Sequence, residues 1–532
     1  MTHKTSGSSA VTEVRARHES CIQSALRTLR QIFDLDAINW AILGTFFILT
    51  LIRVLQHAMW RDECHAWLMG RYSTSFLQLY DLHLYDRHTF CWHACLRILS
   101  LLGFDYHAMQ VFHTLIATAT VFVVLRFSPF TRLTKTLLIF GYFPFFEYAV
   151  ICRVYALGVL LLFITCAVYC RALNRPIFFA LCLLLLAQTT VFMLILAGGF
   201  QLAYVVRAFY SRSDKTYKSW LPHIYGIMIF VCGVVLAGIQ LMPAPDAAIP
   251  SPNTFFTQLT HFEPFARFWN AYCPLPALTP AYWNTNFLDP FPTLQKVLCM
   301  LLFVAAPLAF SYNRAAMAFL LSCEIVLFLF NCYFPSFAAR HIGPVFLALV
   351  VTYWISHSSC NGRYSVQNTA TFLKAQCISI VFAVMLGAHV SAGVLASASD
   401  FARPFSGGKL AARFIQKSYP SDIPIIFDVE ATMPPLVAYL DRPVFCASKK
   451  AWQTDFLQDI RMRPDPLPPE ELAEAVLSFL KSNKRDVLLV VNYWPVYLPR
   501  NITATPVFQS LGIVSGESCF VVHIRYDKVF ER

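Results

Sequence analysis

Long apolar stretches separated by short polar loops run through the chain from residue 37 to residue 397. A helix that crosses the hydrocarbon core of a bilayer needs about 20 mostly apolar residues. About eleven stretches meet or approach that length, so the pattern predicts a polytopic α-helical membrane protein with about eleven transmembrane helices. The predicted spans are residues 38–55, 107–126, 134–146, 151–170, 176–188, 190–207, 220–242, 294–310, 315–333, 342–357 and 373–397.

The basic residues of the loops predict the orientation of these spans. They occur in every second loop, and short loops that are rich in lysine and arginine stay in the cytoplasm. The tail of residues 1–36 is therefore predicted to be cytoplasmic, and an odd number of spans places the C-terminal region on the opposite side. The basic positions on the predicted cytoplasmic side are Arg27, Arg30, Arg126, Arg132, Lys135, Arg171, Arg175, Arg207, Arg212, Lys215, Lys218, Arg314, Arg363 and Lys374.

The region after the last predicted span changes in composition. Short aliphatic runs predict strands, and two amphipathic runs predict helices, the second of which opens with Pro-Pro-Glu-Glu. We expect a transmembrane domain over residues 37–397 and a small extracytoplasmic α/β domain of mixed topology over residues 398–532. The predicted strands are residues 423–427, 487–491 and 520–524, and the predicted helices are residues 409–417 and 469–480.

The overall composition agrees with a membrane protein. Hydrophobic residues make up 57% of the chain and charged residues only 14%, whereas a soluble protein carries roughly 25% charged residues. The net charge is +12, but the basic residues lie mostly in short loops, so topology explains them and no nucleic-acid partner is predicted. Most of the 17 cysteines lie within apolar stretches, and no Cys/His spacing is typical of a zinc site.

The strongest local signal for chemistry follows the first span. Asp62 and Glu63 are adjacent carboxylates at the point where the first helix meets the outer interface. Carboxylates near a bilayer are costly and tend to be functional. The alternative is an ordinary solvated helix end, in which Arg61 pairs with an acid.

A second signal combines Glu147, at the outer end of the third predicted span, with Arg153 and Tyr155 at the start of the fourth. The alternative is a structural ion pair between Glu147 and Arg153 at a helical hairpin, and the two interpretations are compatible.

A third signal is the pair Arg340 and His341, at the outer mouth of the tenth predicted span. An arginine there departs from the positive-inside trend, and its rigid fork of donors suits a phosphate. The alternative is an interfacial arginine that snorkels toward water. The predicted topology brings all three signals to one face, which suits a substrate with an apolar tail and an anionic head, such as a lipid-linked phosphosugar.

These features resemble the GT-C superfamily of integral membrane glycosyltransferases, which includes protein O-mannosyltransferases and the lipid A aminoarabinose transferase. The likeness is greatest to bacterial members. It rests on Trp-Arg-Asp-Glu at residues 60–63, an aromatic-rich segment with its glutamate, arginine and tyrosine at residues 143–155, and Arg-His-Ile-Gly at residues 340–343. A long first outer loop, residues 57–106, and an extracytoplasmic C-terminal domain complete the pattern.

The resemblance implies an inverting transferase that moves a sugar from a polyprenyl-phosphate-linked donor to a hydroxyl of a lipid, glycan or protein acceptor, in contact with membrane lipids. It implies Asp62 as the general base, with Glu63 orienting the acceptor or replacing Asp62. Arg153 and Arg340 would stabilise the phosphate, with His341 as a supporting donor. Neither a metal nor another cofactor is expected, since the outer loops contain no Asp-x-Asp. The other candidate substrate-binding residues are Glu147, Tyr155 and His88, the last lying where family members often carry His-Pro-Pro and this chain has Arg87-His88-Thr89-Phe90.

Two other functions fit parts of the pattern. A transporter or flippase would also have many spans, although its polar residues would lie near mid-membrane. A non-catalytic lipid-binding or scaffold protein is the other. The predicted location is a bacterial inner membrane with the site facing the periplasm, and an endoplasmic reticulum membrane with a lumenal site would give the same pattern.

Overall fold

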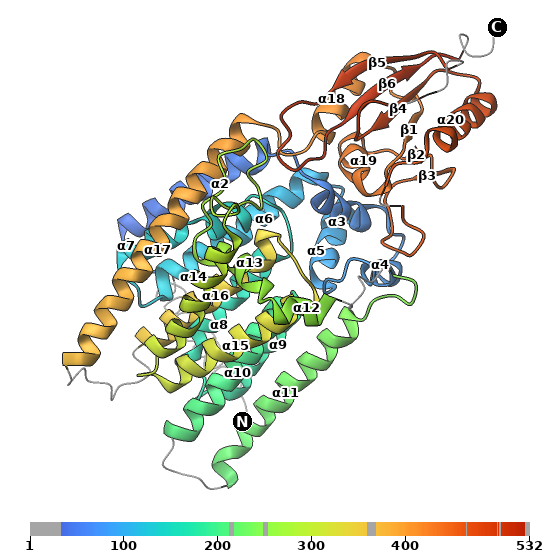
Figure 1. Ribbon diagram of the computed structural model, residues 1–532. Helices are drawn as coiled ribbons and strands as arrows, with labels where there is room; N and C mark the ends of the chain where they lie inside the picture. The colour runs from blue at the N-terminus through green and yellow to red at the C-terminus, as the bar shows by residue number, and fades with distance from the viewer. Residues whose placement is uncertain are drawn as a thin grey trace, which may run out of the picture.

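A computed structural model describes residues 33–211, 217–247, 254–358, 369–463, 465–496, 498 and 502–526. Within them, a bundle of long helices leads into a compact sheet domain at the C-terminal end (Figure 1). The predicted cytoplasmic tail up to residue 32 lies outside the described residues, as do the basic positions Arg212, Lys215 and Arg363.

Eight helices in the described part of the chain have at least 18 residues and are apolar enough to cross a membrane. Each of them corresponds to one predicted span, and together they identify an integral membrane protein. They are α2 (Ala37–Gln56), α6 (Tyr106–Phe127), α10 (Val191–Ser211), α11 (Tyr217–Leu241), α14 (Pro292–Ala309), α15 (Arg314–Tyr333), α16 (Ala339–His357) and α17 (Thr369–Ala402).

The other three predicted spans are shorter. α8 (Tyr155–Tyr169) and α9 (Pro176–Ala187) are single apolar helices, whereas the predicted span 134–146 is divided into α7 (Arg132–Ile139) and one turn of π-helix, η1 (Phe143–Glu147). The prediction of one continuous helix there was wrong. Pro144 lacks a backbone N–H and disfavours helical geometry in the residue before it, which an apolar count does not register.

Two of the loops between the long helices contain short helices. The first outer loop contains α3 (Arg61–Tyr72), α4 (Phe76–His83) and α5 (Cys91–Leu101), and the loop after α11 contains α12 (Phe255–Thr260) and α13 (Glu263–Tyr272). Figure 1 shows α3 and α5 beside the sheet domain, at the end of the bundle that we call the domain side.

The C-terminal domain is built around a mixed six-stranded sheet in the order β3-β2-β1-β4-β6-β5. β1 pairs in parallel with β2 and β4, and the other pairs are antiparallel. The predicted strands and helices are all present, and β2, β3, β5 and α19 are additional. The elements are β1 (Ile425–Phe427), β2 (Val444–Cys446), β3 (Ala451–Gln453), β4 (Val487–Val491), β5 (Ala504–Gln509), β6 (Phe520–Ile524), α18 (Gly408–Ser418), α19 (Pro434–Leu440) and α20 (Pro469–Asn483).

The central strand β4 is apolar at every position because both of its faces are covered. Leu488 and Val490 belong to the core that includes α18 and α19, whereas Val487, Leu489 and Val491 belong to the core under α20. Helices cover both faces of parallel strands in this way. The side with α18 and α19 faces the bundle, and α19 packs against α3, so the domain lies directly on the segment that carries Asp62.

Candidate functional site

Asp62 lies in the first turn of α3, where two arginines from distant elements meet it. Arg340 Nη2 lies 3.0 Å from Asp62 Oδ2, and Arg153 donates a hydrogen bond to the backbone carbonyl of Asp62. Arg61 Nε lies 3.4 Å from the other carboxylate oxygen. The Asp62 side chain remains 23% exposed, so its carboxylate is held in place and is still accessible.

The charge state of Asp62 follows from these contacts. Burial alone would raise the pKa of its carboxyl group, but the guanidinium groups of Arg340, Arg153 and Arg61 hold the pKa below its usual value. Asp62 is therefore a carboxylate near neutral pH and can accept a proton. The alternative of an ordinary solvated helix end does not explain this site, because such an end would not bring Arg153 and Arg340 to Asp62.

Arg340 lies in the first turn of α16 and is buried. Its guanidinium packs over the rings of Trp60 and Trp283, 4.8 and 5.7 Å from their centroids. It therefore points into the protein and does not snorkel toward water. The Tyr148 hydroxyl donates to the Arg340 carbonyl at 3.1 Å. The motif glycine, Gly343, is required beside it, since a Cβ there would stand 2.1 Å from the Tyr148 hydroxyl oxygen.

Arg153 has a second acidic neighbour that the sequence did not single out. Its Nη2 lies 3.7 Å from Asp86 Oδ1, and His93 Nε2 lies 3.1 Å from Asp86 Oδ2. Burial opposes ionisation of Asp86, but the Arg153 guanidinium and the neighbouring His93 hold its pKa well below the usual value. Asp86 directly precedes Arg87 and His88, and the sequence predicted His88 as a candidate substrate-binding residue. Asp86 is therefore the carboxylate next to that predicted position.

Glu147 does not form the ion pair with Arg153 that was the alternative interpretation. It accepts hydrogen bonds from the Tyr142 hydroxyl at 2.9 Å and from Trp283 Nε1 at 3.1 Å. Trp283 comes from the loop between α11 and α14, and it also packs edge-on against Trp60. That loop thus supplies a wall of the site that sequence reasoning missed, and the aromatic pair Tyr282-Trp283 was its only signal.

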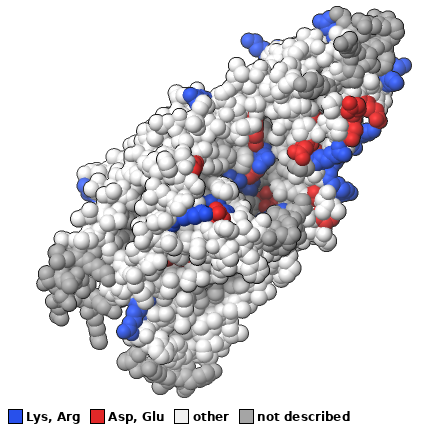
Figure 2. Space-filling model, in the orientation of Figure 1, with Lys and Arg blue, Asp and Glu red and all other residues white. Residues whose placement is uncertain are grey.

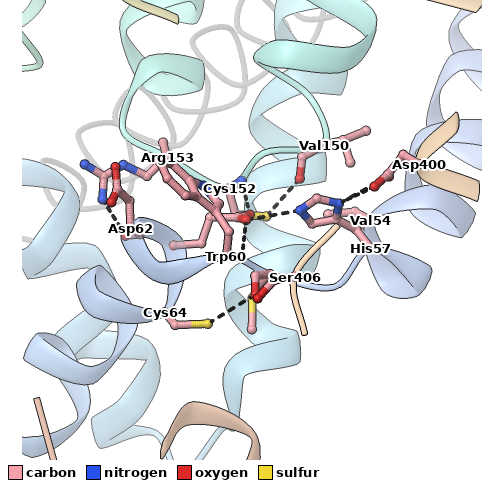
Figure 3. Close-up of polar contacts among 12 residues, drawn as sticks. Val54, His57, Trp60, Asp62, Cys64, Val150, Cys152, Arg153, Asp400 and Ser406 are labelled. Atoms are coloured by element: carbon pink, nitrogen blue, oxygen red, sulfur yellow. Dashed lines mark hydrogen bonds and ion pairs between the residues drawn. The ribbon is translucent and has the colours of Figure 1, made fainter. Parts of the chain in front are cut away.

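Glu63 is fully buried and both of its oxygens are occupied. Oε1 accepts from the Cys152 backbone N–H at 2.6 Å, and Oε2 accepts from the Trp60 N–H at 3.0 Å and lies 3.1 Å from His57 Nε2. The Trp60 contact closes a capping box at the start of α3. Figure 3 shows Trp60, Cys152 and His57 close together. Glu63 therefore fastens the first turn of α3 to two other parts of the bundle.

His57 continues this network to the end of α17. Its Nδ1 lies 2.9 Å from Asp400 Oδ1 (Figure 3), whereas the other ring nitrogen, Nε2, lies near Glu63. Burial alone would lower the pKa of His57, but the carboxylates of Asp400 and Glu63 raise it to about 10. His57 is thus an imidazolium between two carboxylates, and sequence reasoning identified neither His57 nor Asp400.

The remaining predicted residues line the region next to Arg153 and Arg340. The Tyr155 ring lies 5.7 Å from His88 and 5.9 Å from His341. His341 Nδ1 lies 2.6 Å from the Ser336 hydroxyl. Burial lowers the pKa of His88 to about 3, so its imidazole is neutral. The structure thus brings all eight predicted site residues to the domain side of the bundle.

Several buried donors at this site have no partner among the described residues. Within the described residues, no acceptor lies in hydrogen-bonding range of Arg153 Nε, Arg340 Nε or the Tyr155 hydroxyl. Buried polar groups are normally paired, so three open donors on neighbouring residues point to an acceptor that binds there. The described residues contain no group of three or more His, Cys, Asp or Glu arranged to hold a metal ion, and metal independence stays a prediction.

The C-terminal domain holds the turn between α2 and α3 in place. Lys409 Nζ donates to the carbonyls of Leu55, Gln56 and His57 at 3.1–3.2 Å, and the Tyr439 hydroxyl accepts from the Met59 N–H at 2.8 Å. A lysine suits this place because the last carbonyls of a helix lack partners and carry partial negative charge. Figure 2 shows charged side chains of both signs gathered in a hollow of the face between bundle and domain.

Glu517 extends this contact and predicts a pH effect on stability. Its two oxygens each lie 3.2 Å from the Arg61 backbone nitrogen. Burial raises its pKa to about 7, against the opposing effects of Arg61 and the Ser406 hydroxyl, while Asp62 adds to the rise. The folded protein therefore binds this proton more tightly than the unfolded chain, and stability falls as pH rises through that range.

We expect the midpoint of thermal unfolding of wild type to fall relative to that of Glu517→Gln between about pH 5 and pH 8. The slope is at most about 1.4 kcal/mol of unfolding free energy per pH unit. Parallel curves for the two proteins would show that Glu517 does not titrate in this range. Glu474→Gln, at an exposed ion pair of α20, is the control that should follow wild type.

The chain is similar in structure to known proteins but matches none of them in sequence. Neither a protein-family model nor a curated protein sequence matches the chain. Two similar solved structures are ArnT from Cupriavidus metallidurans bound to undecaprenyl phosphate and ArnT from the same organism in the apo state, at 12% and 13% identity. Each comparison has a TM-score of 0.48, and the aligned region covers 92% of this chain and 98% of the ArnT chain.

ArnT belongs to the group of membrane glycosyltransferases that the sequence motifs resemble. At this identity and TM-score the likeness carries no argument about function.

Proposed function

We propose that this protein is an inverting glycosyltransferase that moves a sugar from a polyprenyl-phosphate-linked donor to an acceptor hydroxyl at the membrane surface. One observation carries the proposal: the accessible carboxylate of Asp62 is paired with Arg340, and Arg153 donates to the backbone carbonyl of the same residue, beside the ends of membrane-spanning helices. A proton acceptor next to cations with open donors is what the attack of a hydroxyl on a phosphate-linked sugar requires.

The reaction assigns one role to each group. Asp62 takes the proton of the acceptor hydroxyl as the oxygen forms a bond to the anomeric carbon. The bond between that carbon and the phosphate oxygen breaks, and the lipid phosphate leaves with the electron pair. Arg340 and Arg153 stabilise the charge on the phosphate, and the Tyr155 hydroxyl and the His341 ring border the same space. Donors that are already positioned for the developing charge contribute most in such sites.

In this proposal Glu63 positions Asp62 and does not act as the base. Its oxygens already accept from Cys152, Trp60 and His57, so an acceptor hydroxyl would have to displace one of these buried donors. Glu147 and His88 shape the pocket wall next to Arg340 and Tyr155. The C-terminal domain holds the turn that carries Asp62 and could position the acceptor over it.

We also propose that the site opens on the extracytoplasmic side, in the periplasm of a bacterial inner membrane. The proposal rests on the basic residues of the loops that precede α7 and α9, at the opposite ends of their helices from the site. An endoplasmic reticulum membrane with a lumenal site is the alternative.

Purified protein incubated with a radiolabelled polyprenyl-phosphate sugar tests the proposed reaction. Label must pass from the lipid to a hydroxyl acceptor when a panel of lipid, glycan and peptide acceptors is offered. Movement of the labelled lipid across vesicles without transfer would support the transporter instead, and neither event would support a non-catalytic protein.

Arg340→Gln is expected to lower the turnover number by about 10²–10³-fold, the usual effect of removing one positioned donor from a charge-stabilising site. The loss should be greater for turnover than for acceptor KM, since Arg340 is assigned to the phosphate. Arg71→Gln, which breaks a surface ion pair with Asp441, should transfer sugar at the wild-type rate. Equal activity of Arg340→Gln and wild type would remove Arg340 from the mechanism.

A further inference from the structure

A basic groove lies on the side of His57 away from the candidate site. It forms where α2 and α17 end and α18 begins, and its volume is about 390 Å³. Both α2 and α17 are membrane-spanning helices, so the groove opens where the bundle leaves the bilayer. The residues that line it are Leu55, Gln56, Ala58, Asp400, Phe401, Ala402, Arg403, Pro404, Lys409, Leu410 and Arg413.

The lining carries an excess of positive charge. Arg403 and Arg413 are exposed, and within the described residues neither lies within 4 Å of an acidic group. Asp400, the acid of the groove, is already paired with His57. Lys409 contributes a third cation, and burial together with the charge of Arg413 lowers its pKa to about 8. An anion in the groove would therefore be attracted by Arg403 and Arg413, for which no acidic group of the described residues competes, and by Lys409, which also donates to the backbone carbonyls at the end of α2.

The surroundings of the groove are apolar on the bundle side. The Phe401 side chain is 69% exposed and Leu55 is 39% exposed, and both stand on spanning helices next to the arginines. Basic residues beside apolar surface at a membrane boundary attract anionic lipids. The predicted topology places these arginines outside, where the positive-inside trend does not account for them.

We propose that this groove binds the phosphate headgroup of an anionic membrane lipid, with its acyl chains against α2 and α17. A lipid fits better than a soluble anion, because the apolar rim continues along the two spanning helices. The site is separate from the donor-phosphate site at Arg153 and Arg340, and the inference does not depend on the proposed function.

The groove is connected to the turn that carries Asp62. Asp400 and Lys409 form part of its lining, and they contact His57 and the last carbonyls of α2 respectively. His57 in turn contacts Glu63 in the first turn of α3. A bound headgroup would add an anion beside Lys409 and steady this junction.

Titration of purified full-length protein with a fluorescent phosphatidylglycerol in neutral detergent tests the site, with a phosphatidylcholine of the same chains as the neutral lipid. Wild type should bind phosphatidylglycerol more tightly. The double variant Arg403→Gln/Arg413→Gln should lose about 30-fold in affinity, since each basic residue near a charged lipid surface contributes about 1 kcal/mol. Lys481→Gln/Lys484→Gln removes the same charge from the C-terminal end of α20 and its C-cap and should bind as wild type does.

Three outcomes would overturn the proposal. These are equal affinities of the groove variant and wild type, no preference for phosphatidylglycerol over phosphatidylcholine, and competition by inorganic phosphate as effective as that by the lipid. Both arginines are exposed, so the variant should keep the wild-type elution profile. Arg340→Gln should retain phosphatidylglycerol binding even where transfer is lost, which separates failure of this site from failure of the proposed reaction.

Discussion

Replacing Asp62 with asparagine is expected to lower sugar transfer by about 10²–10⁴-fold while the protein stays folded. Asparagine keeps the shape of the side chain but cannot take the proton of an acceptor hydroxyl. The hydrogen bond from Arg153 survives because it ends on the Asp62 backbone carbonyl, and a side-chain oxygen remains near Arg340. The loss should therefore appear in turnover, measured as label transferred per unit time at saturating donor.

Asp81→Asn is the matched control for this experiment. Asp81 is an exposed carboxylate of α4 in the same outer segment, and its replacement should leave transfer unchanged. The midpoint of thermal unfolding should be similar for wild type and both variants. Wild-type turnover in Asp62→Asn would show that another group takes the proton, and Asp86 would then be the next candidate.

The second large effect concerns stability. Glu63→Gln is expected to lower the free energy of unfolding by about 3–5 kcal/mol, the usual cost of breaking a buried charge pair. The glutamine amide would place its N–H groups against either the Cys152 N–H or the donors of Trp60 and His57, because each glutamate oxygen accepts a hydrogen bond. His57 would also lose one of its two carboxylates.

Thermal unfolding in one neutral detergent measures this effect, with Glu474→Gln as the control. Glu474 pairs with Lys450 at an exposed position of α20, and such pairs contribute about 0–1 kcal/mol. A Glu63→Gln protein as stable as the control would mean that the network around His57 does not hold α3. Reduced activity with full stability would instead assign Glu63 a direct part in the reaction.

The two adjacent carboxylates show how far sequence reasoning could go. It located Asp62 and Glu63 together at the end of the first span but could not separate their roles. The structure separates them by burial and partners: Glu63 is enclosed and accepts from three groups, whereas Asp62 keeps part of its surface and meets two arginines. The side chains of adjacent residues project from a helix in different directions. Only the packing around α3 decides which groups surround each of the two carboxylates.

The sequence by itself determined the membrane-spanning character of the chain, the positions of its long helices, the mixed α/β character of the C-terminal region and the convergence of three motifs at one end. These properties follow from hydropathy, periodicity and loop charge, which are read locally along the chain. The break before η1, the fully occupied state of Glu63, the role of Asp86 and the imidazolium between Glu63 and Asp400 came only from the tertiary structure. His57 and Asp400 are 343 positions apart, and a buried charge acquires its partner through packing that no local pattern encodes.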